Sequence, residues 1–392
     1  MPIVNRVAEF HDDMTAWRRH LHAHPELGFE ETQTAAFVAR HLAEFGVDEL
    51  HEGIGRTGVV AVIRGREGNA RIGLRADMDA LPIQERSGVA HASTVAGKMH
   101  ACGHDGHTAM LLGAARYLAE TRNFAGTVCL FFQPAEEGRA GAKAMIEDGL
   151  FERFPVDEVY GLHNWPGMPL GSFGVCNGPA MAASDEFTIR LEGRGGHAAM
   201  PNLAADPVTA GATIVQAAQT IVSRQIDPLD NAVISITKFI AGDTFNVIPG
   251  EAVLNGTVRT FKPETRDFCE RRLRELASGI ASAMGLGCEY RYRRGYPPTV
   301  NHPNQSVAAG DAAAEIVGAD RVDRNPMPVM GAEDFSYMLE ARPGNYIWMG
   351  THEGGPVSAL HHPEFDFNDN ALSIGTSYWA RLVERLMSHE PV

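Results

Sequence analysis

The chain has 392 residues, which is long for a single hydrophobic core and predicts two domains. Its formal net charge of −15 argues against nucleic acid or an anionic membrane surface as a partner. The five cysteines are scattered and odd in number, and no apolar run has the length of a signal peptide or a membrane span, so we expect a reducing, cytoplasmic location.

The first part of the chain predicts two amphipathic helices, over 3–24 and 30–45, the first of them ended by Pro25. His20 and His24 share one face of the first helix and could in principle bind a metal ion. No carboxylate or thiol nearby completes such a site, so the spacing favours ordinary histidines at a helix end.

Residues 53–58 match the dinucleotide-binding pattern G-x-G-x-x-G. That pattern requires a helix after the last glycine, because the helix N-terminus receives the pyrophosphate. An apolar strand over 59–63 follows instead, so we interpret the match as a turn.

Three short apolar strands, 71–75, 127–132 and 158–162, alternate with helical patterns over 106–121 and 139–149. This order predicts a mostly parallel sheet with helices on both faces, and ligands bind beyond the carboxyl ends of such strands. We expect the polar residues that follow the strands to meet at that edge: Asp77, Asp79, Cys102, His104, Glu136, Glu137 and His163.

Residues 99–108 concentrate histidine, cysteine and aspartate among small residues just before a helix. Cys102 and His104 are ligands that suit a borderline metal such as zinc. For any one of these residues, a buried free cysteine or a surface histidine is the alternative.

Glu136 and Glu137 directly follow the second apolar strand and Pro134. Neighbouring side chains point in different directions, so one carboxylate can bind a metal ion while the other acts as a base. The alternative is a solvated helix start, since acidic residues favour a helix N-terminus.

Small residues over 178–184 indicate a hinge, and the pattern beyond it is β-α-β-β-α-β, the split ferredoxin-like arrangement. Its expected strands are 185–192, 231–240, 251–261 and 287–294, and its expected helices are 203–225 and 263–285. The tail returns to α/β character, with a helix over 304–317, a strand over 345–349 and a helix over 370–387. We therefore expect an α/β metal-binding catalytic domain (1–182 and 295–392) and an inserted α+β domain (183–294).

Six stretches together resemble a known family: 18–27, 74–82, 99–105, 133–138, 195–201 and 360–363. Through them the chain resembles the dimetal aminoacylase and carboxypeptidase superfamily over nearly its whole length. Within that superfamily it is most similar to the hippurate hydrolase and auxin-amino-acid-conjugate (IAA-amino acid) hydrolase subgroup. The resemblance implies a zinc-peptidase-like catalytic domain and an inserted lid and dimerisation domain.

The resemblance also implies two divalent metal ions per chain and Glu136 as the general acid and base. The implied metal ligands are Cys102, His104, Glu137, His163 and His361. His361 is chosen over His362 because it holds the ligand's place before the proline. The same match makes His20, His22 and His24 structural.

One motif departs from the wider superfamily. Its usual His-x-Asp ligand motif falls here on Asp77-Met78-Asp79, which contains no histidine. Cys102 is the apparent substitute in this subgroup, so the bridging group and the metal stay open. Zinc suits a thiolate, and manganese, cobalt and nickel are alternatives by ligand type.

The function that these patterns favour is metal-dependent hydrolysis of small N-acyl amino acids, such as N-benzoyl or N-acetyl amino acids. A dipeptidase or carboxypeptidase of the same superfamily is the alternative. A non-catalytic metal-binding relative is a weaker one, because binding alone does not require Glu136. A serine hydrolase is disfavoured, since no G-x-S-x-G motif is present.

Three residues of the inserted domain are candidates for contacting the substrate. His197 follows a glycine-rich loop and would contact the substrate or donate to an oxyanion, with a loop cap as the alternative. Asn246 and Arg259 are candidates for holding the substrate carboxylate, and either could instead serve the domain surface. We expect the inserted domain to close over the metal site and to form a homodimer, with His197 acting in the same chain or across the interface.

Overall fold

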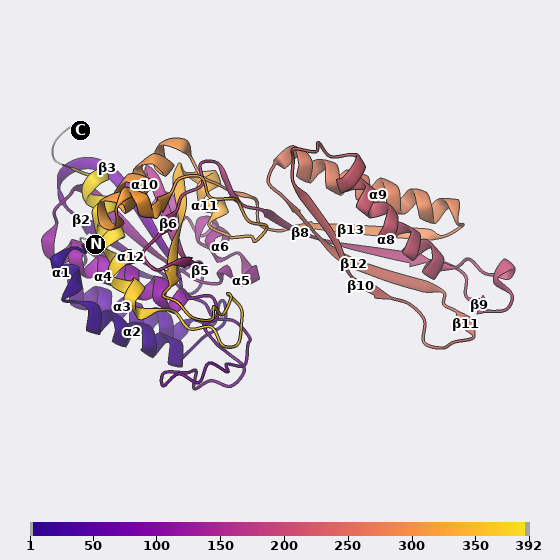
Figure 1. Cartoon of the computed structure of the whole chain (residues 1–392), viewed down its shortest axis with the longest axis horizontal. Coiled ribbons are helices and arrows are strands. Elements are labelled where there is room, and N and C mark those ends of the chain that lie inside the picture. Colours follow the sequence, from indigo (N-terminus) through magenta and orange to yellow (C-terminus); the bar gives the residue numbers. More distant parts are fainter. Residues whose placement is uncertain (1–2, 389–392) are drawn as a thin grey trace. The chain divides into compact units, whose positions relative to one another are not determined.

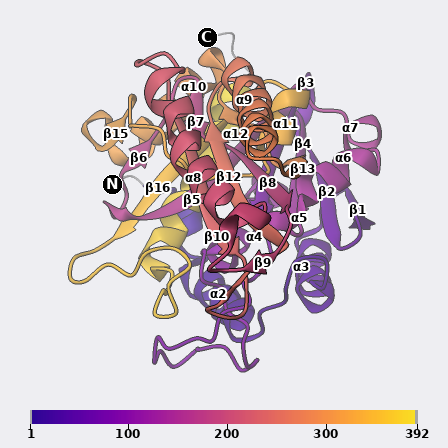
Figure 2. The same cartoon turned by 90° about the vertical axis from the view of Figure 1, so that its right-hand side faces the viewer.

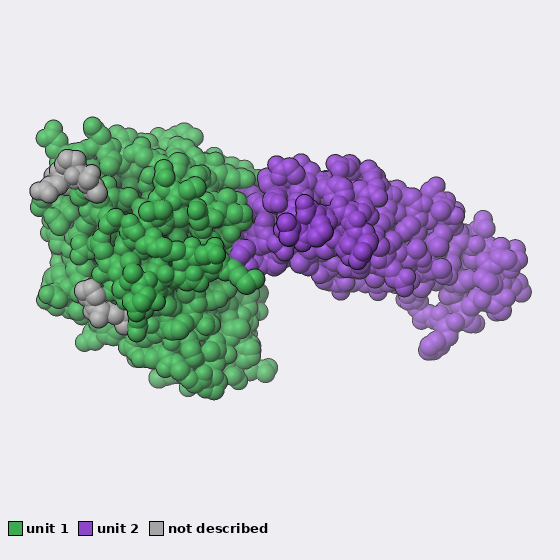
Figure 3. Space-filling view, turned by 45° about the horizontal axis from the view of Figure 1, so that its top comes forward, with its two compact units in different colours: residues 1–180, 300–327, 334–392 green, residues 181–299, 328–333 purple. Residues whose placement is uncertain are grey.

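The computed structural model describes residues 3–388. These residues form two compact units, coloured separately in Figure 3. Unit 1 comprises residues 3–180, 300–327 and 334–388, and unit 2 comprises residues 181–299 and 328–333. Relative to the expected division, residues 181–182, 295–299 and 328–333 lie in unit 2. Within the described residues, every helix is too short or too polar to cross a membrane.

Unit 1 contains an eight-stranded sheet with the order β1-β2-β4-β3-β5-β16-β6-β15. Its strands are β1 (Glu49–Ile54), β2 (Gly58–Arg64), β3 (Arg66–Asp77), β4 (Ala125–Gln133), β5 (Glu158–Pro169), β6 (Phe173–Gly174), β15 (Val322–Asp323) and β16 (Gly344–His352). The central strands β4, β3, β5 and β16 run parallel to one another. Strand β2 pairs antiparallel with β1 and β4, and β6 pairs antiparallel with β16 and parallel with β15. The mostly parallel α/β fold that the sequence predicts is confirmed.

Helices cover both faces of this sheet (Figure 1). They are α1 (Asn5–Ala8), α2 (His11–Ala23), α3 (Thr32–Phe45), α4 (His104–Thr121), α5 (Glu136–Arg139), α6 (Gly141–Glu147), α7 (Leu150–Arg153), α10 (Pro303–Val317), α11 (Ser336–Ala341) and α12 (Leu372–Leu386). Val59, Ala61 and Ile63 of β2 pack into the core that α2, α3, α4 and α12 share. On the opposite face, Phe131 of β4 meets Phe151 of α7 with ring centroids 6.2 Å apart.

Several predicted boundaries differ from the structure. The first expected helix is two helices, α1 and α2. The helix expected over 139–149 extends only from Gly141 to Glu147, because Ala140 before it has a positive φ angle of 59°. Strand β1 is not predicted at all. The interpretation of residues 53–58 as a turn is confirmed, since this segment joins the antiparallel strands β1 and β2.

Unit 2 contains a four-stranded antiparallel sheet with the order β10-β12-β8-β13. Its elements are β8 (Ala183–Glu192), β9 (Gly196–His197), α8 (Pro207–Arg224), β10 (Ala232–Ile240), β11 (Val247–Ile248), β12 (Glu251–Thr260), α9 (Pro263–Ala283) and β13 (Gly287–Arg294). Helices α8 and α9 lie side by side on one face of the sheet (Figures 1 and 2). With β9 and β11 set aside as a short separate ribbon, the order is the expected β-α-β-β-α-β. Two short strands, β7 (Pro179–Met181) and β14 (Thr299–Val300), pair with each other.

Candidate metal centre

The candidate site lies where the parallel strands of unit 1 end. Strand β3 ends at Asp77, β4 ends shortly before Glu136, and α4 begins at His104. His163 lies inside β5 rather than after it, so the predicted strand end at residue 162 is wrong. The reason is that β5 continues beyond its last pair with β3 and stays hydrogen-bonded to β16.

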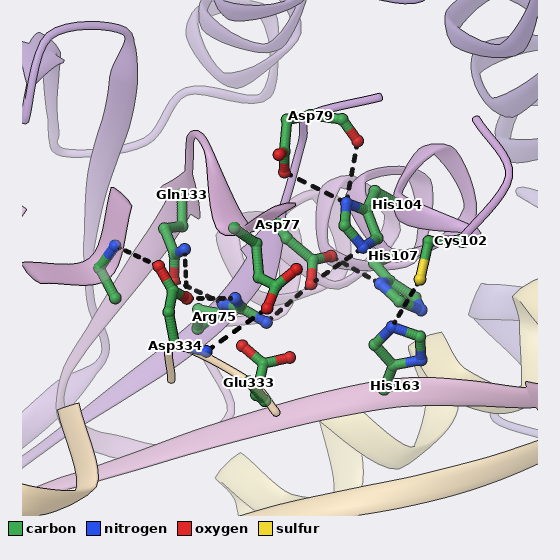
Figure 4. A network of polar contacts seen from close by, with 12 residues as sticks. Arg75, Asp77, Asp79, Cys102, His104, His107, Gln133, His163, Glu333 and Asp334 are labelled. Carbon is green, nitrogen blue, oxygen red and sulfur yellow. Dashed lines mark hydrogen bonds and ion pairs between the residues drawn. The ribbon is translucent and has the colours of Figure 1, made fainter. Parts of the chain in front are cut away.

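Cys102 is close to three other predicted ligands. Its Sγ lies 3.5 Å from His163 Nε2 (Figure 4). Cys102, Glu137 and His361 each offer a ligand atom within 4.8 Å of the others. Within this group, Glu137 Oε1 is 3.1 Å from His361 Nε2. Thiol, imidazole and carboxylate groups thus surround one point, as in a borderline-metal site.

Asp79 sets the orientation of His104. The His104 Nδ1 atom lies 2.9 Å from the Asp79 carbonyl oxygen and 3.2 Å from Asp79 Oδ1, so Nδ1 carries the proton and donates. Its Nε2 is buried, has no hydrogen-bond partner among the described residues and lies 3.6 Å from Asp77 Oδ2. His104, Glu136 and Glu137 offer ligand atoms within 4.8 Å of one another. A buried, unpartnered imidazole nitrogen that a carboxylate orients from behind fits a metal ligand.

His163 has the same arrangement. Its Nδ1 donates to the backbone carbonyl of Asn164 at 2.8 Å, so Nε2 presents a lone pair toward Cys102. Burial, together with the neighbouring His107 ring, holds the pKa of His163 well below its usual range. A neutral imidazole with a free lone pair is the form that binds metal.

His107 and Asn164 belong to the site but were not predicted. His107 Nδ1 lies 2.6 Å from Asp77 Oδ1, and its Nε2 lies 2.7 Å from Asn164 Oδ1 and 3.0 Å from the backbone N of Asn164. Helical spacing could have identified His107, because it lies three positions after His104 and therefore on the same face of α4.

Arg75 extends this network toward the base candidate (Figure 4). The buried guanidinium donates to Asp77 Oδ2 at 2.8 Å, to Gln133 Oε1 at 2.8 Å and to Asp334 Oδ1 at 3.2 Å. The backbone N–H of Asp334 in turn lies 3.4 Å from Glu136 Oε1. An arginine within an apolar strand is a signal for such a buried ion pair, although it does not identify the partner.

The electrostatics of the site fit a bound cation. Burial, followed by the carboxylates of Glu137 and Glu136, raises the pKa of the Cys102 thiol well above its usual value. Burial lowers the pKa of His104, but the carboxylates led by Asp77 outweigh it and raise that pKa to about 10. A divalent cation would balance this surplus of negative charge and displace both protons.

His361 reaches the site from a loop. Its backbone has a φ of +65°, in the left-handed region, and its N–H donates to the Ala101 carbonyl at 2.7 Å. The neighbouring His362 instead accepts the N–H of Glu364 at Nδ1, 3.2 Å away, within a local turn. Of the two neighbouring histidines, His361 is the one that offers a ring nitrogen within 4.8 Å of ligand atoms of Cys102 and Glu137.

His197 and Asn246 lie together in unit 2. His197 is the last residue of β9 and pairs with Val247 of β11, and both His197 and Asn246 are exposed. The Asn246 carbonyl accepts the N–H of Ala198 at 3.0 Å. His197 Nδ1 accepts the N–H of Ala199 at 3.1 Å, which leaves the proton on Nε2 as a possible donor.

Arg259 lies elsewhere in the same unit. It is on β12, opposite Ser184 of β8, and its Nη1 donates to Ser184 Oγ. Burial lowers the pKa of Arg259, and no carboxylate lies within ion-pair distance of it among the described residues. From Glu251, at the start of β12, to Arg259 the strand spans about 26 Å, at roughly 3.3 Å per residue. Asn246 precedes that start, so one chain does not bring Arg259 and Asn246 together.

An α/β sheet with thiol, imidazole and carboxylate groups gathered at its strand ends is the architecture of a metal-dependent hydrolase. The model of peptidase family M20/M25/M40 matches residues 73–385, and the chain belongs to this family.

The chain is 42% identical to the hippurate hydrolase of Campylobacter jejuni, covering 97% of this chain and 98% of that protein. It is also 42% identical to an N-acetylcysteine deacetylase of Bacillus subtilis, covering 95% and 96% of the two chains. Among solved structures, a dinuclear metal-binding M20 peptidase of Bacillus subtilis superimposes with a TM-score of 0.85 at 37% identity, covering 98% of this chain and all of the other.

The Asp79→Asn variant should bind divalent metal about 10- to 100-fold more weakly than the wild type. An asparagine has a single acceptor oxygen, whereas Asp79 accepts from His104 and also, at 2.9 Å, from the N–H of Glu137. Competition with a chromogenic chelator measures the affinity. The exposed Asp12→Asn serves as a charge-matched control and should bind metal normally; equal affinity in both variants would contradict the orienting role.

Proposed function

We propose that this M20-family amidohydrolase cleaves N-acyl amino acids into a carboxylic acid and a free amino acid. The observation that carries the proposal is the convergence of ligand-type side chains around Cys102, with Glu136 beside Glu137. The names of two relatives, a hippurate hydrolase and an N-acetylcysteine deacetylase, support N-acyl amino acids as the substrate class.

In this proposal the residues around Cys102 hold two divalent ions. The ligands would be Cys102, His104, Glu137, His163 and His361. When bound, the ions would supply Lewis acidity and lower the pKa of a water molecule toward neutrality. Zinc suits the thiolate and the imidazoles, with manganese, cobalt or nickel as alternatives.

Glu136 is the proposed general base and acid. The residue is 7% exposed, and the backbone N–H of Asp334 lies 3.4 Å from Oε1. Buried there, it would take a proton from the attacking water and deliver it to the nitrogen of the leaving amine. Its neighbour Glu137 points toward His361, which leaves the two carboxylates with different tasks.

The two glutamates should therefore respond differently to the same substitution. Glu136→Gln should keep its metal and lose about 10²- to 10⁴-fold in kcat, because the amide cannot shuttle a proton. Glu137→Gln should instead lose metal. Elemental analysis beside amine release from N-acetyl and N-benzoyl amino acids measures both. Metal loss in Glu136→Gln with full occupancy in Glu137→Gln would reverse the assignment, and full turnover by metal-free protein would rule out the mechanism.

Arg259 is the proposed anchor for the substrate carboxylate. Its guanidinium is half-buried without a carboxylate partner in the described chain, and such a donor gains from a planar, bidentate anion. Asn246, an exposed amide, is the second candidate.

A substrate pair tests this anchor. Benzoylglycine should be cleaved with a kcat/KM at least about tenfold higher than benzoylglycinamide, because the amide lacks the charge that Arg259 would bind. The preference should shrink in Arg259→Gln, whereas the exposed Arg291→Gln is a control that should keep it. Equal activity on both substrates would count against recognition of a free carboxylate, and faster cleavage of dipeptides would favour the dipeptidase alternative.

We also infer a homodimer in which unit 2 forms a lid that contributes His197. His197 and Asn246 lie beyond one end of β12 and Arg259 near the other, so one small substrate cannot contact both groups from a single chain. A second copy would resolve this by supplying one of the two sets. The Nε2–H of His197 would then donate to the oxyanion of the tetrahedral intermediate.

Complementation tests the dimer. Mixing inactive Glu136→Gln with inactive His197→Ala protein should restore part of the activity, because some mixed sites receive both intact residues. Subunit exchange is verified independently by a mass-tagged copy. No recovery despite exchange would place His197 in the same chain as its metal site, and a monomer by analytical ultracentrifugation would contradict the dimer.

A reducing, cytoplasmic location is also part of the proposal. All five cysteines are free, and four of them are buried. Such thiols persist where the compartment keeps them reduced.

A further inference from the structure

Arg18 of α2 is a buried cation that holds aspartates from two distant parts of the chain. Its Nε donates to Asp369 Oδ1 and its Nη1 to Asp366 Oδ1, each at 2.7 Å. Nη1 also lies 3.5 Å from Asp105 Oδ2. The Arg18 side chain is 1% exposed and that of Asp105 is fully buried, whereas Asp366 and Asp369 are 29% and 15% exposed.

The partners of Arg18 lie next to two of the segments that carry proposed metal ligands. Asp105 directly follows His104 on α4, and Asp366 lies five residues after His361 in the loop that follows β16. The two segments also touch directly. Besides the bond from the His361 N–H to Ala101, the Phe367 ring packs so closely on Gly106 that a Cβ there would come within 2.5 Å.

His22, one turn after Arg18 on α2, strengthens the same connection. Its Nδ1 lies 2.8 Å from Asp105 Oδ2, and its Nε2 lies 3.1 Å from Glu85 Oε1. Arg18 and His22 lie one turn apart on α2, and both therefore contact Asp105. The sequence motif that contains His22 gives no metal site here, but it places two donors on the helix face that meets the metal-binding segment.

His361 needs such external support. Its side chain is 53% exposed, so packing of the ring does little to fix it. Its positive φ is a backbone conformation that non-glycine residues keep only where the surroundings hold them. The loop from 361 to 369 is therefore the part of the candidate centre whose position depends most on contacts made by other residues.

We propose that Arg18 is a positioning residue that presets the distance between the Cys102–His104 segment and the loop that carries His361. The inference rests on the proposed ligand role of His361. By tying Asp105 to Asp366 and Asp369, the guanidinium holds the two segments together before metal arrives, which lowers the ordering cost of binding. Lysine retains the charge but lacks the planar fork that reaches several carboxylates at once.

Zinc binding to the metal-free protein tests the proposal without reference to activity. Arg18→Lys should bind zinc at least about tenfold more weakly than the wild type in chelator competition, as losses of outer contacts to metal ligands do. Arg19→Lys is the matched control. Arg19 also pairs with Asp369, at 2.8 Å, but it is 50% exposed and makes no described contact with Asp105 or Asp366, so its zinc affinity should be unchanged.

A double-mutant cycle separates positioning from general destabilisation. In a His361→Ala background, Arg18→Lys should cause little further loss, because the residue through which it acts is gone. An additive loss, or wild-type zinc affinity in folded Arg18→Lys, would overturn the proposal. Should Arg18→Lys fail to fold, Asp366→Asn at the partly exposed end of the contact takes its place, with the same two outcomes. Wild-type affinity in His361→Ala would overturn the ligand assignment and this inference together.

Discussion

The carboxylate of Asp79 makes the contact on which the candidate metal centre depends. One oxygen faces His104 Nδ1 at 3.2 Å, and the other accepts the N–H of Glu137 at 2.9 Å. The two donors belong to different helices, α4 and α5. A single buried group thereby fixes the ring of one ligand and the backbone of another. With Asp79 in place, His104 Nε2 and the Glu137 carboxylate face the same space.

Much of this arrangement could be predicted from the sequence, because parallel strands bring their carboxyl ends to one edge. Asp77, Glu136 and His163 follow or end apolar runs, and the sheet order makes these runs neighbours. Cys102 and His104 instead lie just before and at the start of the helix that follows β3. The turn at 53–58 was predicted from its neighbour in the same way. Its glycine pattern alone matches a dinucleotide-binding loop, but the strand that follows it indicates a turn. The ferredoxin-like order of unit 2 followed from its alternating periodicity.

The contacts that connect the site to its surroundings could not be predicted in this way. Arg75 and Asp334 are buried partners 259 positions apart, and Arg18 and Asp366 are 348 positions apart. No local pattern links such residues. The C-terminal end of β5 could not be predicted either, because β5 remains paired with β16 beyond its last pair with β3. Residues such as His107 were within reach, since helical spacing places that ring beside His104.

The chain order of the two units has a consequence for synthesis on the ribosome. Unit 2 is formed almost entirely by the contiguous segment 181–299, so its core can assemble soon after that segment emerges. The sheet of unit 1 must wait, because β16, between β5 and β6, comes from the last part of the chain. Until β16 is synthesised, the edge of β5 that pairs with β16 has no partner. An unpaired hydrophobic strand edge can pair with another chain or be bound by a chaperone. His361, a proposed ligand, is translated later still, so a growing chain lacks it until synthesis nears the end of the sequence.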